Sequence, residues 1–258
     1  MKHEKKIPVY RRMKRYFKNR FFEALEARGQ YYVEVGRGVD RVCPICGYEG
    51  RFAPFGLRNI RVDAQCLECG SLERHRLLYL YLAEKKPFQN TSKVVHFAPE
   101  NIIRDIVDGT VGSYVTADLV RDDVDHNWNI EAIDAPDASF DGIICNHVLE
   151  HVDADRALNE CRRILRPDGV GIFTFPICEG LDQTYEDPAI VTDDGRFAHF
   201  GQSDHVRIFG RDVRARFPAA GLALEEFFVG GDLAARHGLT IGERVFVVRP
   251  LPAVAVSG

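Results

Sequence analysis

The sequence lacks the long apolar segments that a membrane span or a secretory signal requires. No run of about 18 uncharged apolar residues occurs, and the Lys- and Arg-rich start of the chain is not followed by an apolar stretch. This pattern predicts a cytoplasmic protein. Internal repeats and low-complexity tracts are also missing, so we expect one α/β core with a small additional module.

The cysteines do not suit a disulfide framework. Seven occur, which is an odd number, and four of them stand in two Cys-x-x-Cys pairs. In a reducing compartment such pairs indicate metal binding, and a redox motif would not need a second matching pair. The other three are expected to be small apolar fillers: Cys145, Cys161 and Cys178.

The paired cysteines define a small module, which we call the four-cysteine module, over residues 31–70. Its two knuckles are Cys43-Pro-Ile-Cys46-Gly47 and Cys66-Leu-Glu-Cys69-Gly70. In each knuckle a tight turn presents two sulfurs to one ion, the following glycine relieves the backbone, and four thiolates complete a closed tetrahedral site. The spacing predicts one structural zinc ion, because about forty residues bury too little apolar surface to fold without such a link.

Charge is distributed unevenly along the chain. Residues 1–30 carry a net charge of +7 and the remainder carries −11. An acidic body of this kind is a poor general binder of nucleic acid. Residues 8–28 interleave aromatic side chains with Arg and Lys, which is typical of a basic amphipathic helix. This arm packs on its own protein or on a second subunit of a homodimer, or it contacts a membrane surface or a polyanion.

From residue 71 to residue 258 the pattern is that of a parallel α/β sheet. Ser71 is the expected N-cap of an apolar helix that runs to Lys85-Lys86-Pro87. Strands are expected at 93–97, 114–117, 142–145, 170–175, 223–229 and 244–248, and helices at 100–108, 153–165 and 210–220. The alternation places helices on both faces of one sheet.

Two segments of this domain are similar to a known family. Ser139-Phe-Asp-Gly-Ile-Ile-Cys-Asn-His-Val-Leu-Glu-His-Val152 and Ala157-Leu-Asn-Glu-Cys-Arg-Arg-Ile-Leu-Arg-Pro-Asp-Gly169 resemble the fourth strand, the next helix and the turn before the fifth strand of class I S-adenosylmethionine-dependent methyltransferases. The resemblance covers about residues 90–250. It implies a Rossmann-like, seven-stranded α/β sheet with S-adenosylmethionine across the carboxyl ends of the first strands.

The resemblance places the methyl donor on residues at those strand ends. Asp118 follows the second strand, where an acid can accept both ribose hydroxyls. The first loop, residues 95–100, departs from the family pattern because it has no glycine, and the missing fingerprint also disfavours NAD. Small Ala98 still admits the ligand to the backbone, Pro99 begins the next helix, and Glu100 receives the ammonium of the methionine part. The expected cofactor contacts are Phe97, Ala98, Pro99, Glu100, Asp118, Asn129, Ile130 and Asn146.

His147-Val-Leu-Glu150-His151 falls where the family places the transferring methyl group. If this segment is helical, its spacing turns three side chains toward one point. We expect His151 to be a general base, because an imidazole can take the proton of an oxygen nucleophile near neutral pH. The alternative role is packing and hydrogen bonding to the cofactor.

The long segment after the fifth strand is expected to form a substrate wall, because it exceeds the length of a simple connection. His205 is the alternative base, Asp204 orients a histidine, and Tyr185 and Arg207 hold the acceptor. Some family members bind a divalent ion through a Glu-x-x-Glu-His set and a distant His. The resemblance therefore suggests a second metal site, for Mn, Fe, Ni or Zn. Its expected ligands are His147, Glu150, His151 and His205.

These features predict an S-adenosylmethionine-dependent O-methyltransferase that acts on a small-molecule or glycan-type acceptor. The first alternative is an RNA methyltransferase in which the basic arm and Arg51, Arg58 and Arg61 of the four-cysteine module contact the RNA backbone. The second is a non-catalytic binding module on the methyltransferase fold. The glycine-free loop is the feature that suggests it.

Overall fold

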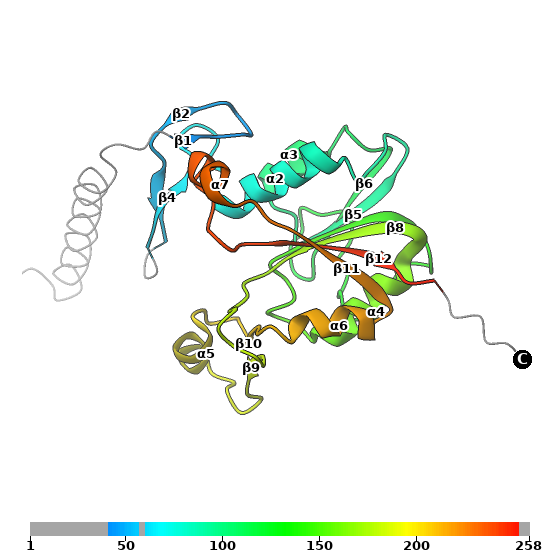
Figure 1. Ribbon diagram of the computed structural model, residues 1–258. Helices are drawn as coiled ribbons and strands as arrows, with labels where there is room; N and C mark the ends of the chain where they lie inside the picture. The colour runs from blue at the N-terminus through cyan, green and yellow to red at the C-terminus, as the bar shows by residue number, and fades with distance from the viewer. Residues whose placement is uncertain (1–40, 57–59, 253–258) are drawn as a thin grey trace, which may run out of the picture.

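The computed structural model describes residues 41–56 and 60–252 (Figure 1). The predicted basic arm, residues 1–30, lies outside this part, as do the first ten residues of the four-cysteine module and Arg58. Within the described ranges, no helix is both long and apolar enough to cross a membrane.

The four-cysteine module consists of two short antiparallel hairpins. Strand β1 (Arg41–Val42) pairs with β2 (Glu49–Gly50), and β3 (Ala53–Phe55) pairs with β4 (Arg61–Gln65). The first knuckle is the turn between β1 and β2, and the second follows β4. Helix α7 (Gly231–His237), which is far away in the sequence, packs against β1, so the module is seated on the end of the larger domain (Figure 1).

The larger domain is built on a six-stranded sheet. Its strands, in spatial order, are β11 (Leu222–Phe227), β12 (Val245–Pro250), β8 (Leu165–Thr174), β7 (Phe140–Asn146), β5 (Lys93–Phe97) and β6 (Ser113–Ala117). Strands β8, β7, β5 and β6 are parallel, whereas β12 is antiparallel to both of its neighbours. The expected Rossmann-like α/β sheet is confirmed, and β5, β6 and β7 end at one common edge.

The predicted seventh strand is not found among the described residues. The sheet stops at β6, and residues 118–139, which are rich in Asp and Asn, form an irregular segment. This segment folds back along β6. The Thr116 N–H donates to Asp125 Oδ2 at 2.8 Å, the His126 N–H donates to the Thr116 carbonyl at 3.1 Å, and the Asp118 N–H donates to the His126 carbonyl at 3.1 Å. The loop therefore supplies hydrogen-bond partners for part of the backbone on the free edge of β6.

Helices cover both faces of the sheet (Figure 1). One face carries α4 (Ala154–Ile164) and α6 (Val213–Ala219), and the other carries α2 (Glu73–Lys85), α3 (Asn101–Val107) and α7. Each face has its own apolar core. The first core includes Leu158, Phe217 and Phe246, and the second includes Leu77, Ile103 and Ala234. Burial of these side chains is the main favourable contribution to folding.

The long segment after β8 has structure of its own. Strands β9 (Tyr185–Glu186) and β10 (Arg207–Ile208) pair antiparallel, and α5 (Asp193–Phe200) lies between them. In Figure 1 these elements project from the carboxyl edge of the sheet.

Two cysteine predictions are confirmed and one is wrong. Cys145 on β7 and Cys161 on α4 are buried in the first core, as expected of apolar fillers. Cys178 is exposed, because it follows the end of β8 and lies on the wall of a cavity.

His96 is a fully buried histidine in the middle of the sheet. Its Nδ1 lies 2.7 Å from the Tyr114 hydroxyl, and Nε2 is buried without a partner among the described residues. Burial lowers the pKa of His96 to about 3, against about 6.5 in an unfolded chain. Between these two values the unfolded state binds a proton that the folded state does not.

We therefore expect the free energy of unfolding to fall as the pH is lowered from about 6.5, by up to about 1.4 kcal/mol per pH unit. Urea denaturation at pH 7.5, 6 and 5 measures this slope. The double variant His96→Leu, Tyr114→Phe should flatten it relative to the natural sequence. The range above pH 5 also excludes Glu100, whose pKa is lowered to about 2. Parallel slopes in the two proteins would contradict the assignment to His96.

Candidate functional site

The four cysteines of the four-cysteine module form one cluster. Their sulfurs all lie within 4.8 Å of one another, with Cys43 to Cys69 at 3.6 Å and Cys46 to Cys66 at 3.7 Å. A metal with bonds of about 2.3 Å to four sulfurs requires sulfurs about 3.8 Å apart, so the cluster fits one tetrahedral ion. Gly47 and Gly70 have φ of +77° and +71°. This left-handed conformation explains why glycine follows each knuckle.

Ser71 is not the N-cap of α2. The N-cap is Leu72, and Ser71 Oγ instead lies 3.4 Å from Cys43 Sγ and 3.2 Å from Cys69 Sγ. The Leu72 N–H donates to His75 Nδ1 at 3.1 Å. The serine hydroxyl therefore lies against the cysteine sulfurs, and the His75 ring in the first turn accepts the hydrogen bond of the N-cap N–H.

Arg76 joins the four-cysteine module to the rest of the protein. Its guanidinium is fully buried and donates to four backbone carbonyls, those of Ala64 at 3.0 Å, Ser71 at 2.6 Å, His237 at 2.7 Å and Gly238 at 2.7 Å. It also lies over the ring of Phe52, at 4.4 Å from the ring centroid. These carbonyls come from the four-cysteine module, from the start of α2 and from the end of α7.

The glycine-free loop adopts the shape that glycine usually supplies. Ala98 has φ of +49°, and its N–H donates to the Ala117 carbonyl at 2.9 Å. A left-handed alanine is strained by roughly 1–2 kcal/mol, and its small side chain leaves the backbone of the turn open to a close approach. Phe97 and Pro99 on either side are buried. The loop thus fits a ligand that approaches the backbone closely at the ends of β5 and β6.

Glu100 follows this loop and caps α3, and it is bound to the start of α2. Its Oε1 accepts from Arg74 Nε at 3.0 Å, from Arg74 Nη2 at 2.5 Å and from His75 Nε2 at 2.8 Å. Burial opposes ionisation of this carboxyl, but the His75 hydrogen bond and the Arg74 charge outweigh it and lower its pKa to about 2. Glu100 is therefore a carboxylate at any ordinary pH.

Asp118 begins the segment that follows β6. Its Oδ1 accepts from the N–H groups of Val120 and Arg121, at 2.9 and 3.0 Å, while its Oδ2 has no hydrogen bond within the described ranges. Arg121 Nη1 donates to the Pro99 carbonyl at 2.6 Å, so this segment is tied to the first loop. One oxygen of Asp118 fixes its own turn, and the other is available to a ribose hydroxyl.

The remaining predicted cofactor residues have mixed surroundings. Asn129 is exposed, and its Oδ1 accepts from the Glu131 N–H at 2.9 Å. Ile130 packs in the first core. Asn146 is buried at the end of β7, where Oδ1 accepts from Thr174 Oγ1 at 3.0 Å and Nδ2 has no partner within the described ranges.

The His147–His151 segment is a turn and not a helix, so the expected convergence of its three side chains is only partly found. His147 has φ of +52°. Its Nδ1 lies 3.2 Å from Glu150 Oε1, and its Nε2 is buried without a partner among the residues described. The side chain lines a cavity of about 550 Å³. Because the carboxylate accepts the Nδ1 proton, Nε2 is the unprotonated nitrogen of this ring.

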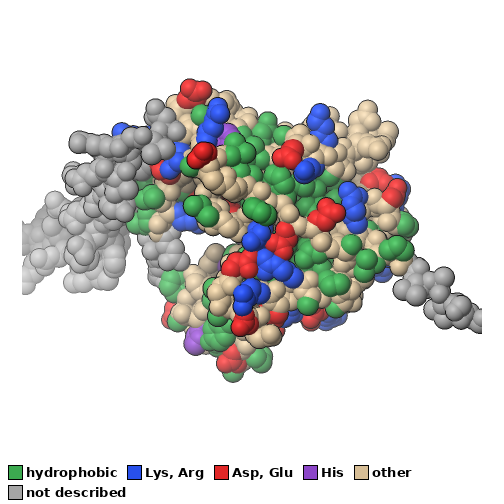
Figure 2. All heavy atoms as spheres, in the orientation of Figure 1, with side chains coloured by type: hydrophobic (Ala, Val, Ile, Leu, Met, Phe, Trp, Pro, Cys, Tyr) green, Lys and Arg blue, Asp and Glu red, His purple; other side chains and the backbone are tan. Residues whose placement is uncertain are grey.

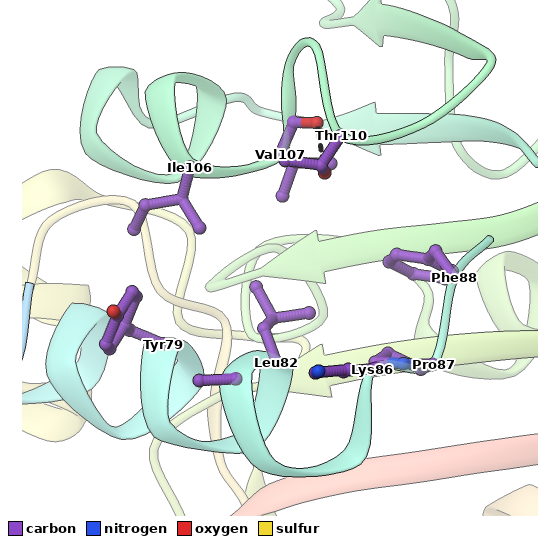
Figure 3. Close-up of a pocket in the computed structure, with 9 residues that line it drawn as sticks. Tyr79, Leu82, Lys86, Pro87, Phe88, Ile106, Val107 and Thr110 are labelled. Carbon is purple, nitrogen blue, oxygen red and sulfur yellow. Dashed lines mark hydrogen bonds between the residues drawn. The ribbon is translucent and has the colours of Figure 1, made fainter. Parts of the chain in front are cut away.

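The cavity is lined by both parts of the protein. The four-cysteine module and α2 contribute Arg61, Glu73 and Arg74, the end of β8 contributes residues 175–179, and the segment before β12 contributes residues 240–244. A smaller cavity of about 380 Å³ lies between α2 and α3 (Figure 3), where Leu82, Phe88 and Ile106 give it an apolar lining. It contains none of the predicted site residues.

Glu150, His151 and His205 form a second cluster of potential metal ligands, with one ligand atom of each within 4.8 Å of the others. The Val206 N–H donates to the Glu150 carbonyl at 3.0 Å, which joins the two segments. His151 Nδ1 lies 3.1 Å from the Asp204 carbonyl and 3.4 Å from Asp204 Oδ2. Burial lowers the pKa of His205. Asp204 thus contacts His151 through both its carbonyl and its carboxylate, and its orienting role stays a prediction.

The two residues predicted to hold the acceptor, Tyr185 and Arg207, do not line the cavity of about 550 Å³. Tyr185 is partly exposed, and its hydroxyl lies 2.6 Å from His199 Nδ1. Arg207 is largely buried. Its Nη1 donates to the carbonyls of Leu149, at 2.8 Å, and Val152, and its Nε donates to Glu186 Oε2 at 2.8 Å. Its guanidinium therefore holds the His147–His151 turn in place.

Sequence reasoning missed three residues at this site. Arg74 and His75 stand in the charged run that opens an otherwise apolar helix, and this run was the available signal. Glu243 gave no signal in the sequence. It lines the cavity with a buried Oε2 that has no partner in the described part of the chain, and burial raises its pKa.

The middle of the larger domain matches a known family model. Residues 113–173 match a family described as a methyltransferase domain. The match begins after the glycine-free loop and ends within β8, so it covers β6, β7, α4 and the His147–His151 turn. No curated protein sequence matches the chain.

Solved structures share the fold at low sequence identity. A chain from the complex between the Haloferax volcanii Trm112 methyltransferase activator and a methyltransferase is 16% identical, with a TM-score of 0.50 over 69% of this chain and 91% of that one. An S-adenosylmethionine-dependent methyltransferase from Mesorhizobium loti is 14% identical, with a TM-score of 0.49 over 67% and 96%. The 1,6-didemethyltoxoflavin-N1-methyltransferase from Burkholderia thailandensis is 16% identical, with a TM-score of 0.48 over 68% and 76%.

The left-handed alanine yields a prediction for the cofactor loop. Ala98→Gly should bind S-adenosylmethionine as the natural protein does and keep its free energy of unfolding within about 1 kcal/mol. Ala98→Val should lose about 1–3 kcal/mol of stability and bind the cofactor more weakly, because a β-branched residue resists positive φ. Urea denaturation and calorimetric titration measure both effects. Unchanged binding and stability in the valine variant would show that the loop does not require this conformation.

Proposed function

We propose, from the premise that this chain is an S-adenosylmethionine-dependent methyltransferase with the class I fold, that its acceptor is a hydroxyl group of a polar small molecule or glycan. In this reaction the methyl group leaves the sulfonium for the acceptor oxygen. A base takes the hydroxyl proton, and S-adenosylhomocysteine is released.

The observation that carries this proposal is the position of His147. Its side chain lines the cavity, its Nε2 is buried and has no partner among the described residues, and Glu150 Oε1 lies 3.2 Å from the opposite ring nitrogen. A carboxylate that orients an imidazole in this way keeps the base in the correct tautomer. We therefore assign proton removal to His147, whereas the sequence pattern favours His151 or His205.

The lining of the cavity supports a polar acceptor of limited size. Charged side chains, Glu73, Glu179, Glu243, Arg61, Arg74 and Arg244, line the space of about 550 Å³ together with apolar ones such as Phe175, Ile177 and Ile241, so it suits an acceptor with both polar and apolar parts. The four-cysteine module contributes Arg61 and so acts as one wall of the acceptor site.

The distribution of charge does not favour the RNA alternative. Positive and negative side chains alternate on the visible face (Figure 2). Arg61 is paired with Glu73 at 2.8 Å, and Arg244 is paired with Glu179 at 3.0 Å. Nucleic-acid surfaces instead present unpaired Lys and Arg to the phosphates.

We assign zinc to the four-cysteine module, since a closed set of four thiolates is typical of structural zinc. We also place a divalent transition metal at Glu150, His151 and His205. Glu150 Oε2 is buried and has no partner within the described part of the chain, and Asp204 holds His151 Nδ1 so that Nε2 is the ligand nitrogen. His147 is excluded from this set by its position on the cavity.

The two metal sites predict distinct losses. Cys46→Ser should lose about one zinc per chain and destabilise the four-cysteine module, while His205→Ala should keep that zinc and lose binding of added Mn²⁺. Elemental analysis measures the zinc, and electron paramagnetic resonance measures the manganese. Full zinc content in Cys46→Ser contradicts the first assignment. Equal manganese binding in His205→Ala and the natural protein contradicts the second.

The base assignment is tested by transfer of a tritiated methyl group from S-adenosylmethionine to methyl glycosides, with total RNA as the competing acceptor. His147→Gln should lower kcat by about 10²–10⁴-fold and leave the affinity for S-adenosylhomocysteine unchanged. His199→Gln, a histidine outside the cavity, is the matched control. Labelling of RNA alone would support the RNA alternative, and an unchanged kcat in His147→Gln would overturn the role of this residue.

A further inference from the structure

We propose that Arg74 and Glu100 together bind the amino-acid end of S-adenosylmethionine, with Arg74 on its carboxylate and Glu100 on its ammonium. The inference rests on the cofactor in the proposed function and is independent of the acceptor. It makes the helix that follows the four-cysteine module part of the donor site.

The hydrogen bonds of Glu100 leave half of its carboxylate free. His75 Nδ1 accepts from the Leu72 N–H at 3.1 Å, so the ring proton is on Nε2, which donates to Glu100 Oε1 at 2.8 Å. Both Arg74 donors also reach Oε1, at 3.0 and 2.5 Å. Three donors thus converge on one oxygen, and no described residue binds Oε2.

Arg74 has a matching free group. Its Nε and Nη2 are occupied by Glu100, and its Nη1 makes no hydrogen bond with any residue that the structure describes. About a quarter of each side chain is exposed, 26% for Arg74 and 23% for Glu100, and Arg74 lines the large cavity. One guanidinium nitrogen and one carboxylate oxygen of this ion pair therefore have no hydrogen bond to any described residue, and Glu100 follows the Ala98 turn.

This arrangement complements an α-amino acid zwitterion. The ammonium and carboxylate of methionine are attached to one carbon, so a receptor needs an anionic and a cationic group in direct contact. The neighbouring pair of Arg61 and Glu73 differs, because Arg61 Nε and Nη2 occupy both carboxylate oxygens of Glu73, at 2.8 and 3.4 Å. A control outside the cavity is Arg166, whose Nη1 lies 2.5 Å from Oδ1 of Asp141 at the start of β7.

The test compares three ligands by calorimetric titration. S-adenosylmethionine carries both charged groups, its decarboxylated analogue lacks only the carboxylate, and 5′-methylthioadenosine lacks the whole amino-acid end. Arg74→Met should lower the affinity for S-adenosylmethionine by about 10–100-fold, which is the effect of losing a charged hydrogen bond. It should leave the affinities for the other two ligands unchanged. Arg74→Lys should restore part of the loss, and Arg166→Met should change none of the three affinities.

Glu100→Gln should lower the affinity for both ligands that carry the ammonium and leave the affinity for 5′-methylthioadenosine unchanged. Equal weakening of all three ligands by Arg74→Met would mean that Arg74 only supports the fold, and unchanged affinity for S-adenosylmethionine would also overturn the proposal. Because no methyl transfer is measured, these outcomes are separate from the roles of His147 and the acceptor. No binding of any ligand to the natural protein would refute the cofactor assignment itself.

Discussion

Arg76 carries a positive charge into the contact between the four-cysteine module, α2 and α7, where four backbone carbonyls surround it. Burial lowers the pKa of this guanidinium, and Glu73 and the cysteine sulfurs oppose that shift. A buried charge is tolerated only when its hydrogen bonds are complete and charge of the opposite sign is near. Four thiolates around a divalent ion supply such negative charge. The four-cysteine module and the larger domain therefore depend on each other, although their sequence patterns look independent.

The position of α2 has consequences for the rest of the site. Its first turn holds Glu100, which caps α3 directly after the Ala98 turn. A glycine-rich turn would reach this conformation without strain. Here a strained alanine is kept in place by neighbours, among them the Arg121 contact to the Pro99 carbonyl. Contacts from outside the loop compensate for the missing glycine.

The parts of the structure that depend on local pattern were predictable. Strand β5 was predicted with its observed bounds, and α4 to within one residue at either end, because period-2 and period-3.6 apolar patterns identify buried strands and amphipathic helices. The cysteine pairs predicted their cluster because the Cys-x-x-Cys spacing of each knuckle is a local signal for shared metal ligands. Predictions that assumed a backbone conformation were less successful. His147 has a positive φ and lines the cavity, whereas His151 and His205 cluster with Glu150, and sequence spacing does not encode that difference. The charged run marks Arg74, His75 and Arg76 but does not assign their roles, because Glu100 and the His237 and Gly238 carbonyls are distant in sequence.

The end of the described sheet at β6 has an effect beyond the shape of the sheet. An edge strand presents unpaired backbone groups, which favour association with strands of other molecules. Along β6, Asp125 and His126 occupy several of these groups. The same segment begins with Asp118, which the sequence predicts to hold the ribose. A substitution that loosens residues 118–126 would thus expose an aggregation-prone edge as well as remove a ligand contact. Solubility and cofactor binding constrain the same short stretch of chain.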